Sequence, residues 1–504
     1  MATLKELREE RLRKINELNK LGINPYPART AVKTSIDMLK QAFEESSEEK
    51  QVVSAGRIIG IRQHGQIAFL TVKDGSGDIQ LFLRADGLEG ANRSESQLNF
   101  ADLRLLDLGD FVEASGRIMR SRSGEVTIDT SKLRLLSKAM RPMPTAWDGL
   151  KDKEVRLRRR YVDLNVNEDV RQRFIRRSRF WQSNRDFLNR HKFIEINIPV
   201  LEHTTGGADA KPFKTHMDVL DTDFYLRISH ELPLKKLIGG GYDKVYDIGP
   251  RFRNEHYTEE HLPEHVALEW YWAYADWRRG MGLMTNMLLH VMQETFGKLQ
   301  FKIGDFDVDL SKEWEEWDYC DVIKRHYDID PLNCSLEDVK KALTENNLVV
   351  EKVENKARGI DKLWKNIRKT VEGPVWLVNT PLFISPLAKS NPNRPETVER
   401  FQPVIAGSEL GNGWSELNDP QDQLNRFLEQ QKLRDGGDNE AQMLDIDYVE
   451  MLEYGMPPTC GWGHSERLFW LFEGVSAREG VPFPQLRPEI DEVTRGIYSD
   501  IDFH

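Results

Sequence analysis

Residues 249–270 read GPRFRNEHYTEEHLPEHVALEW. An apolar run stands on each side of a polar loop, which predicts two strands joined by that loop. The first strand leads Arg251, Arg253 and Glu255 into the loop, and the second carries Glu269. Arg–Glu pairs on strands are usually structural partners, so the pattern alone is a weak signal of a binding site. An Arg side chain nevertheless offers a planar fork that suits a phosphate or a carboxylate.

Other segments supply further charged residues at comparable places. Glu231 lies in LRISHELPLKKL (226–237), and Tyr271 shares one strand face with Glu269 because the two are two residues apart. The segments GSELGNGWSELND (407–419) and GWGHSER (461–467) add Glu409, Asn412, Glu416 and Arg467. Buried acids are costly unless they meet cations. The set therefore predicts a site for a polyanion, a metal ion and a cationic ligand.

Composition and charge narrow the class of protein. A chain of 504 residues suggests two or three domains, and 30% charged residues are typical of globular proteins. The chain has no long apolar run and a highly charged N-terminus, so we expect neither a membrane span nor a secretory signal. Three widely spaced cysteines favour a reducing cytoplasm over a zinc site or disulfide framework. A net charge of −11 argues mildly against a general nucleic-acid coat.

The first third of the chain predicts a small β-barrel. Leucines at helical spacing over residues 3–22 predict an amphipathic helix with a basic exposed side, within a lead-in that covers residues 1–50. Residues 51–143 then alternate in five short strands, with a helical stretch over 94–106 after the third. This order predicts an OB-fold barrel, a frequent binder of single-stranded nucleic acid. A barrel used only for packing is the alternative.

The rest of the chain predicts an α+β domain. Residues 144–170 are interpreted as a linker, and residues 171–504 as an antiparallel sheet with helices to one side and a helical insertion near 310–375. Predicted strands cover 193–201, 224–229, 244–252 and 265–275, with a strand pair in 401–419. A helix follows over 419–437, and a glycine-rich turn near 461 opens an apolar helix. The basic runs 155–164 and 170–180 favour solvated helix faces.

Several of these segments carry a family resemblance over nearly the whole chain. FIEINIPVL (193–201), RFRNE (251–255) with its loop, and CGWGHSER (460–467) resemble the three motifs of the class II aminoacyl-tRNA synthetases. TTGGADAKPFKTH (204–216), YLRISHELPLKKL (225–237), ISPLAKSNP (384–392) and GNGWSELNDPQDQ (411–423) resemble the lysyl-tRNA synthetase branch. The resemblance implies an OB-fold anticodon-binding domain, a class II catalytic domain, and a homodimer formed through the first motif near Pro199.

The resemblance also implies an activity: L-lysine is activated with ATP and Mg²⁺ and joined to tRNA(Lys) through a lysyl-adenylate, releasing AMP and pyrophosphate. Its implied ATP-binding residues are Arg253, Glu255, His261, His265 and Arg467, of which Arg253 and Arg467 act as catalytic arginines on the α- and γ-phosphates. Its implied lysine-binding residues are Gly207 and Glu231 for the α-amine, Asn412 for the carboxylate, and Glu269, Tyr271 and Glu416 for the ε-ammonium. Glu409 and Glu416 would hold the metal, and Phe69, Gln80 and Glu125 would bind the anticodon.

Four differences from the family pattern lie on the ATP side. His265 stands where a phenylalanine usually stacks on adenine, and Glu260 stands where an arginine usually precedes His261. Gln402, seven residues before Glu409, replaces a usual second metal-binding acid. The third motif, GWGHSER, is one residue shorter than usual. We expect an active enzyme that holds its nucleotide differently.

Two other function classes remain open at this point. A non-catalytic tRNA-binding paralogue would be expected to lose the lysine pocket, whereas Glu231, Glu269 and Glu416 are present. An aspartate- or asparagine-type synthetase needs a cationic pocket, whereas these side chains are acidic. The expected partners are therefore ATP, lysine, tRNA(Lys) and a second copy of the chain, in the cytoplasm and without a membrane.

Overall fold

The computed structural model of the protein describes residues 3–31, 33–90, 92–144, 150–208, 210–255, 258–350, 353, 355–437 and 441–502. The chain forms two compact units, Met1–Lys151 with Arg487–His504, and Asp152–Leu486. Each has its own apolar core. Within the described ranges, no helix combines the length and the apolar character needed to cross a membrane.

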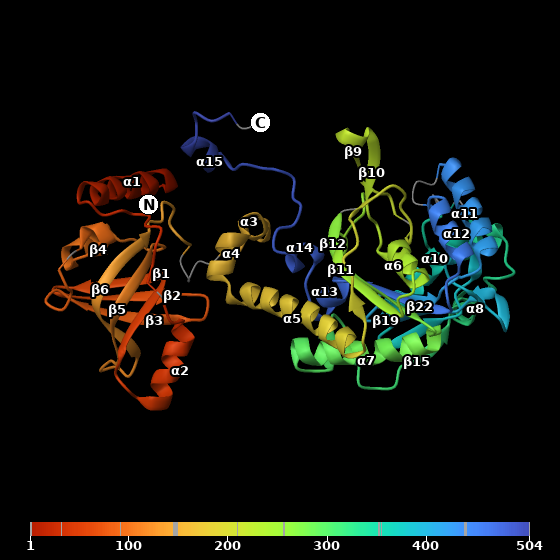
Figure 1. Ribbon diagram of the computed structural model, residues 1–504, viewed down its shortest axis with the longest axis horizontal. Coiled ribbons are helices and arrows are strands. Elements are labelled where there is room, and N and C mark those ends of the chain that lie inside the picture. Colours follow the sequence, from red (N-terminus) through yellow and green to blue (C-terminus); the bar gives the residue numbers. More distant parts are fainter. Residues whose placement is uncertain are drawn as a thin grey trace. The chain divides into compact units, whose positions relative to one another are not determined.

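The first unit is the predicted OB-fold barrel (Figure 1). The barrel consists of β1 (Gln51–His64), β2 (Ile67–Lys73), β3 (Asp78–Arg84), β5 (Phe111–Arg120) and β6 (Val126–Ser137), with the short β4 (Gln97–Leu98) at the side. A parallel pairing of β3 with β6 closes it. The predicted N-terminal helix is confirmed as α1 (Leu4–Lys20), which Thr3 and Glu6 cap reciprocally. Helix α2 (Ile36–Ser46) follows it.

The predicted helical stretch over 94–106 is not an α-helix. It consists of two 3₁₀ helices, η1 (Arg93–Glu95) and η2 (Phe100–Leu105), on either side of β4. Asn99 caps η2 with Asp102, and the buried Leu98 and Leu103 anchor the segment to the barrel core. The pairing of β4 with β6 interrupts the segment, so it does not form one continuous helix.

The second unit is built on a nine-stranded sheet that is antiparallel apart from its two outermost pairings. In spatial order the strands are β15 (Glu315–Asp318), β16 (Val375–Val378), β19 (Arg400–Ile405), β21 (Asn412–Ser415), β22 (Thr459–Ser465), β12 (Glu264–Ala273), β11 (Lys244–Phe252) and β7 (Ile194–Glu195), with β20 (Ser408–Glu409) beside β19. A smaller sheet joins β8 (Leu201–Glu202), β10 (Thr222–Leu226) and β9 (Lys214–Met217). The opening sequence stretch is confirmed as β11, a loop and β12.

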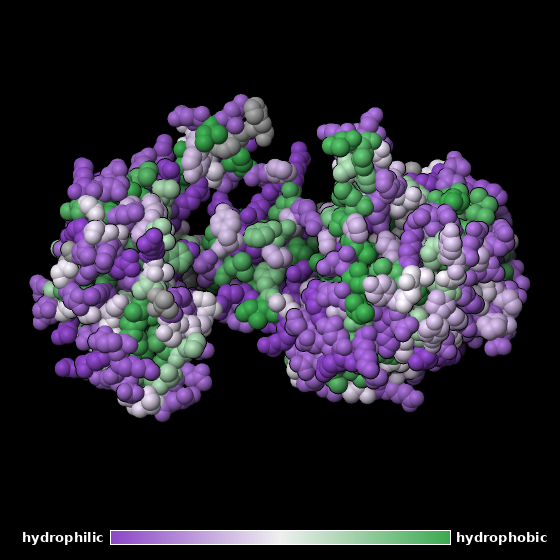
Figure 2. Space-filling view, viewed as in Figure 1, coloured by the Kyte–Doolittle hydropathy of each residue, from purple (hydrophilic) through white to green (hydrophobic). Residues whose placement is uncertain are grey.

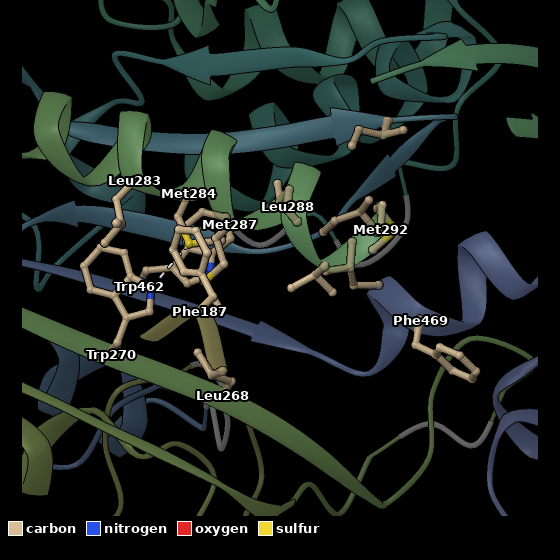
Figure 3. Close-up of a cluster of buried hydrophobic side chains, with 14 of the residues drawn as sticks. Phe187, Leu268, Trp270, Leu283, Met284, Met287, Leu288, Met292, Trp462 and Phe469 are labelled. Carbon is tan, nitrogen blue, oxygen red and sulfur yellow. Dashed lines mark hydrogen bonds between the residues drawn. The ribbon is translucent and has the colours of Figure 1, made fainter. Parts of the chain in front are cut away.

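Helices α5 (Glu168–Arg190) and α7 (Trp277–Phe296) lie side by side along the sheet (Figure 1). Leu268 and Trp270 of β12 point into the core that these helices form with α13 (Arg467–Glu473), and Trp270 Nε1 lies 3.3 Å from Met284 Sδ (Figure 3). Because side chains alternate along a strand, Glu269 and Tyr271 point to the other face. That face carries α6 (Glu231–Gly239) and α12 (Ile446–Tyr454), whose apolar residues form a second core with Tyr271.

Further helices complete this unit. Those within the predicted insertion are α8 (Tyr319–Tyr327), α9 (Leu336–Glu345) and α10 (Lys356–Ile367), and they share an apolar cluster around Trp364 with β16 and β19. The predicted helix over 419–437 is confirmed as α11 (Pro420–Asp435). The other elements of this unit are short. Two are hairpins, β13 (Gln300–Ile303) with β14 (Phe306–Asp309) and β17 (Ser390–Asn391) with β18 (Arg394–Val398). The others are the 3₁₀ helices η3 (Asp218–Leu220), η4 (Arg368–Thr370) and η5 (Leu382–Ile384), and helix α14 (Ala477–Gly480).

The two compact units divide the chain at other residues than the predicted domains. Most of the predicted linker is helical and belongs to the second unit: α3 (Lys153–Arg158) and α4 (Arg160–Val166) precede α5, and Arg160 pairs with Asp163 at 2.7 Å, both buried. Residues 145–149 of that linker lie outside the described residues. The catalytic domain also ends before residue 504, because Arg487–His504 joins the first unit. There α15 (Glu492–Ile497) approaches α1, and Arg8 lies over the Tyr498 ring.

Two predicted local structures are also wrong. The glycine-rich segment near 461 is not a turn but the central strand β22, paired with β12 and β21. Residues 193–201 do not form one strand, because β7 and β8 lie in different sheets. Polar residues and glycines weakened the period-two signal in β22, whereas its neighbouring strands supply the hydrogen bonds that make it a strand.

The β9–β10 hairpin of the second unit has an apolar surface. Apolar residues gather on the β9–β10 hairpin in Figure 2, and Met217, Val219 and Leu220 at its tip are exposed. The hairpin tip therefore does not contribute these side chains to a core.

Candidate active site

A cavity of about 450 Å³ opens on the face of the sheet opposite α5 and α7. Its volume lies within the range of small-ligand sites. The cavity brings together every predicted site residue of this unit: Gly207, Glu231, Arg253, Glu255, His261, His265, Glu269, Tyr271, Glu409, Asn412, Glu416 and Arg467. Their individual roles stay predictions, but their convergence from separate strands and loops is a property of the fold.

Glu269 lies at the acidic end of this cavity and is 4% exposed. Its Oε1 accepts hydrogen bonds from Ser229 Oγ at 2.8 Å and from the His230 backbone N–H at 3.1 Å, and its Oε2 accepts from Tyr271 OH at 3.1 Å. The Arg251 guanidinium approaches Oε1 at 3.9 Å. Glu269 is thus well satisfied by the protein, and it orients the Tyr271 hydroxyl so that the hydroxyl oxygen can accept a hydrogen bond from a ligand.

Glu231 and Glu416 form the floor of the same end and share one buried lysine. Lys235 Nζ donates to Glu231 Oε1 at 2.7 Å and to Glu416 Oε2 at 2.8 Å, and Trp414 Nε1 donates to the same Glu416 oxygen at 2.8 Å. Burial raises the pKa of Glu231 and of Glu416. Burial opposes the charge of Lys235, but the two carboxylates outweigh it and raise the pKa of Lys235 well above its ordinary value.

Glycines on β22 and before β9 make room for these side chains. A Cβ on Gly461 would lie 2.1 Å from Glu416 Oε1 and 2.4 Å from Tyr271 Cε1. Gly207 has a φ of +82°, and a Cβ there would lie 2.7 Å from the Glu231 Cβ. Both positions therefore require glycine, for close approach in one case and for backbone conformation as well in the other.

The other end of the cavity is basic. Arg251 Nε donates to His265 Nε2 at 2.7 Å, so the proton of this imidazole is on Nδ1, which faces the Leu262 carbonyl oxygen at 3.3 Å. Burial, reinforced by Arg251 and Arg253, lowers the pKa of His265 well below its ordinary value, and the ring is neutral. Burial next to Arg253 lowers the pKa of Arg251 to about 9, which leaves it charged at neutral pH.

Arg467 is paired with an acid from the loop. Its guanidinium donates to Glu260 Oε2, and Glu260 is one of the residues that depart from the family pattern. Burial lowers the pKa of Arg467, while Glu260 favours its charged form. The neighbouring Glu466 is fixed by Arg177 at 2.6 Å and by the Val266 backbone N–H at 3.0 Å, and it holds the start of α13 against β12.

Glu409 lines the cavity near Gln402, and Trp364 of α10 donates its indole N–H to Glu409 Oε1. No group of three or more His, Cys, Asp or Glu side chains suited to a metal ion occurs in the described part of the chain. Asn412 is held by Arg400, whose Nη2 donates to Asn412 Oδ1 at 2.6 Å. The amide nitrogen of Asn412 is thus oriented by a neighbouring cation.

The predicted anticodon residues lie together on the barrel. Phe69 on β2 stacks on Phe82 of the paired β3, with ring centroids 5.1 Å apart and an interplanar angle of 27°. Gln80 Nε2 donates to Glu125 Oε2 at 2.9 Å. Half-buried aromatic rings beside polar side chains are typical of a surface on which bases stack.

Sequence reasoning missed several residues of these sites. Phe82 was detectable, because Phe69 and Phe82 stand equally far from the turn between β2 and β3 and must therefore face each other. Lys235 also left a signal, a lysine inside an apolar helix four residues after an acid. Trp414 was detectable as well, because it stands two residues before Glu416 and shares a strand face with it. Arg400 and Trp364 left no signal, since their partners Asn412 and Glu409 lie 12 and 45 residues away in the chain.

Comparison with known proteins agrees with both units. Residues 152–487 match the family described as tRNA synthetases class II (D, K and N), and residues 52–136 match the OB-fold nucleic acid binding domain. The lysine–tRNA ligase of Fervidobacterium nodosum is 42% identical over 494 residues, 97% of this chain and 95% of that protein. The lysine–tRNA ligase of Thermosipho melanesiensis is 41% identical over 491 residues, 96% of each chain. That of Thermotoga maritima is 40% identical over 493 residues, 96% of this chain and 97% of that protein. The chain therefore belongs to the class II tRNA synthetases of the D, K and N group.

Proposed function

We propose that the protein is a lysine–tRNA ligase, which activates L-lysine with ATP and transfers the lysyl group to tRNA(Lys). The observation that carries this proposal is the cavity with an acidic end around Glu416 and a basic end around Arg253 and Arg467. A lysine side chain requires buried acceptors, whereas an aspartate or asparagine side chain requires donors. The acidic end therefore supports lysine over the other two amino acids of the group.

In the proposed complex, the ε-ammonium donates to Glu416 and to the Tyr271 hydroxyl oxygen, which Glu269 orients from behind. Glu231 and the Gly207 backbone hold the α-amine, and the amide of Asn412 holds the carboxylate. A neutral analogue would leave these buried acceptors unsatisfied, so discrimination of about 10⁴-fold or more is expected. The buried acids thus serve selection of the amino acid and do not transfer protons.

The first chemical step is an attack of the lysine carboxylate oxygen on the α-phosphorus of ATP. The new bond joins the carboxylate oxygen to the α-phosphorus, the bond from the α-phosphorus to the oxygen that bridges it to the β-phosphorus breaks, and pyrophosphate leaves with that oxygen. Arg253 offsets charge at the α-phosphate and Arg467 at the γ-phosphate, because this reaction needs positioning and charge neutralisation more than acid–base help. A terminal hydroxyl of the tRNA then attacks the carbonyl carbon, and AMP leaves.

Magnesium fits the basic end of the cavity as an ion shared with the triphosphate. Mg²⁺ in phosphoryl-transfer sites is usually held by one or two carboxylates together with substrate oxygens. Glu409 supplies a carboxylate there, and Gln402 supplies an amide oxygen without charge. Glu416 fits less well, since Lys235 and Trp414 both donate to its Oε2. When bound, the ion would offset charge on the phosphates.

Three further parts of the proposal concern the tRNA anticodon, the oligomeric state and the cellular compartment. The OB-fold barrel with Phe69, Gln80 and Glu125 supports recognition of the anticodon. Homodimerisation through the first motif is supported by the exposed Ile194, Pro199 and Leu201. A cytoplasmic setting is supported by the three cysteines, which are free thiols.

Lysine-dependent exchange of radioactive pyrophosphate into ATP tests the activation step directly. We expect exchange with lysine and none with aspartate, asparagine or norleucine, followed by charging of tRNA(Lys). Exchange with another amino acid in place of lysine, or binding of tRNA without any exchange, would overturn the proposal in favour of one of the two alternatives.

Replacing Glu260 with glutamine tests whether the ion pair with Arg467 competes with ATP. The neutral side chain releases the guanidinium for the γ-phosphate, and a partly exposed ion pair is worth about 0.2–1 kcal/mol. We therefore expect the KM for ATP in the exchange assay to fall about two- to fivefold, with the KM for lysine unchanged. A rise in the KM for ATP would show that Glu260 assists nucleotide binding.

Replacing Phe69 with alanine tests the proposed anticodon surface. One stacked base contributes about 1–3 kcal/mol, so the KM for tRNA(Lys) is expected to rise at least about fivefold. The barrel is a separate unit, and lysine-dependent pyrophosphate exchange should keep its rate. The exposed Ile59 on β1 provides a matched control, since Ile59→Ala also removes an apolar side chain from the barrel surface. Equal charging by all three proteins would contradict the assignment.

A further inference from the structure

The cluster of Glu231, Lys235 and Glu416 contains a charged residue that no step of the proposed mechanism uses. Lys235 is fully buried, with 0% of its surface exposed. Among the described residues that line the cavity, Glu231 and Glu416 are present and Lys235 is not. The lysine therefore lies behind the two carboxylates and acts on a ligand only through them.

The contacts of Lys235 divide each carboxylate into a held and a remaining oxygen. Nζ holds Glu231 Oε1 at 2.7 Å and Glu416 Oε2 at 2.8 Å, and the Tyr448 ring of α12 covers it with its centroid 5.2 Å away. Glu416 Oε1 is buried and has no hydrogen-bond partner among the described residues. This oxygen lies beside Gly461, where a Cβ would approach it to 2.1 Å. The geometry leaves one buried acceptor for a donor from a ligand.

The acidic end of the cavity contains three carboxylates, and nearby cations offset some of their negative charges. Glu269 is offset by Arg251 and by three hydrogen-bond donors. Burial raises the pKa of Glu231 and Glu416, and the Lys235 ammonium acts against this shift. When both carboxylates are ionised they carry two negative charges, and Lys235 supplies one positive charge. One negative charge is left, which matches the net charge of a bound lysine with its two ammonium groups and one carboxylate. Without Lys235 the cluster would carry one more negative charge than the bound lysine can offset, and unpaired buried charges are costly.

We infer that Lys235 is a positioning residue for recognition of the substrate lysine: it fixes the side chains of Glu231 and Glu416 and neutralises one of their charges, so that the cavity presents the remaining oxygen of each carboxylate and one net negative charge. This inference rests on the proposed function. It assigns the specificity of the pocket to an internal cation as well as to its acids. The i, i+4 spacing on α6 places Lys235 beside Glu231, and the fold brings Glu416 to the same point.

The test compares Lys235→Met with Lys236→Met in the full-length protein. Methionine keeps the length and the apolar stem of lysine and removes its charge. We expect the KM for lysine in pyrophosphate exchange to rise about 10- to 100-fold, because both carboxylates lose their shared partner, with the KM for ATP within about twofold of the wild type. Lys236 is the neighbouring residue, pairs with Asp447 at the surface, and should tolerate the same change.

Each outcome of this comparison has a clear meaning. A folded Lys235→Met protein with an unchanged KM for lysine overturns the inference, and so does an equal rise in both KM values, which would indicate general damage. If Lys235→Met does not fold, Lys235→Arg keeps the charge but places a longer, planar group against Glu416. We then expect a selective rise in the KM for lysine, and a wild-type KM would overturn the inference. Absence of lysine activation by the wild type and by Lys236→Met would instead refute the proposed function itself.

Discussion

Substitution of Glu416 by glutamine should lower kcat/KM for lysine in pyrophosphate exchange by about 10²- to 10³-fold. The carboxylate is 1% exposed, and its Oε1 is a buried acceptor with no hydrogen-bond partner in the described part of the chain. Glutamine has nearly the same shape but loses the charge that we propose pairs with the ε-ammonium. The measurement is the exchange rate as a function of lysine concentration at saturating ATP.

The fold should survive this change, because Lys235 keeps its partner Glu231 at 2.7 Å. Thermal unfolding followed by circular dichroism checks this point. Glu453→Gln on α12 is a matched control, since it makes the same chemical change at an exposed position of the same unit. Wild-type lysine kinetics in a folded Glu416→Gln protein would show that the ε-ammonium binds elsewhere.

Substitution of Arg467 by methionine should have an effect of similar size on the nucleotide side. Loss of one cation that offsets charge developing on the phosphates typically costs about 10²- to 10³-fold in rate. We expect this loss in kcat/KM for ATP, with the KM for lysine within about threefold of the wild type. Arg325→Met, at an exposed position of α8, is the control for removing an arginine from this unit.

Combining Arg467→Met with Glu260→Gln tests whether the two residues act on ATP together. In the wild type it releases Arg467, so it should lower the KM for ATP. In the Arg467→Met protein the ion pair is already lost, and adding Glu260→Gln should have no further effect, because coupled residues are not additive. Additive effects in the double variant would mean that Glu260 acts on ATP independently of Arg467.

Much of the site could be predicted from the sequence, because local patterns record it. The alternation in 265–273 placed Glu269 and Tyr271 on one face of a strand, and the structure confirms that both line the cavity. The apolar runs around the polar loop predicted β11 and β12, and the turn signals of the first third predicted the barrel. These features depend on residues close in the chain, for which the side-chain period is a direct signal.

The differences between the predicted and the observed structure have another cause. The glycine-rich segment near 461 has no strand pattern of its own, and it becomes β22 because β12 and β21 supply its hydrogen bonds. Residues 487–504 show no strong apolar period, yet they join the first unit through contacts such as that of Arg8 with Tyr498. In both cases the decisive interactions come from other parts of the chain.

The sequence by itself determined the two units, the strand–loop–strand at the centre of the catalytic sheet, and the residue types that meet in the cavity. Only the tertiary structure decided how their charges are paired: Lys235 with Glu416, 181 residues away, and Arg467 with Glu260, 207 residues away. The reason is physical. Periodicity shows which face of an element is buried, but the partner of a buried charge depends on which distant elements the fold brings beside it.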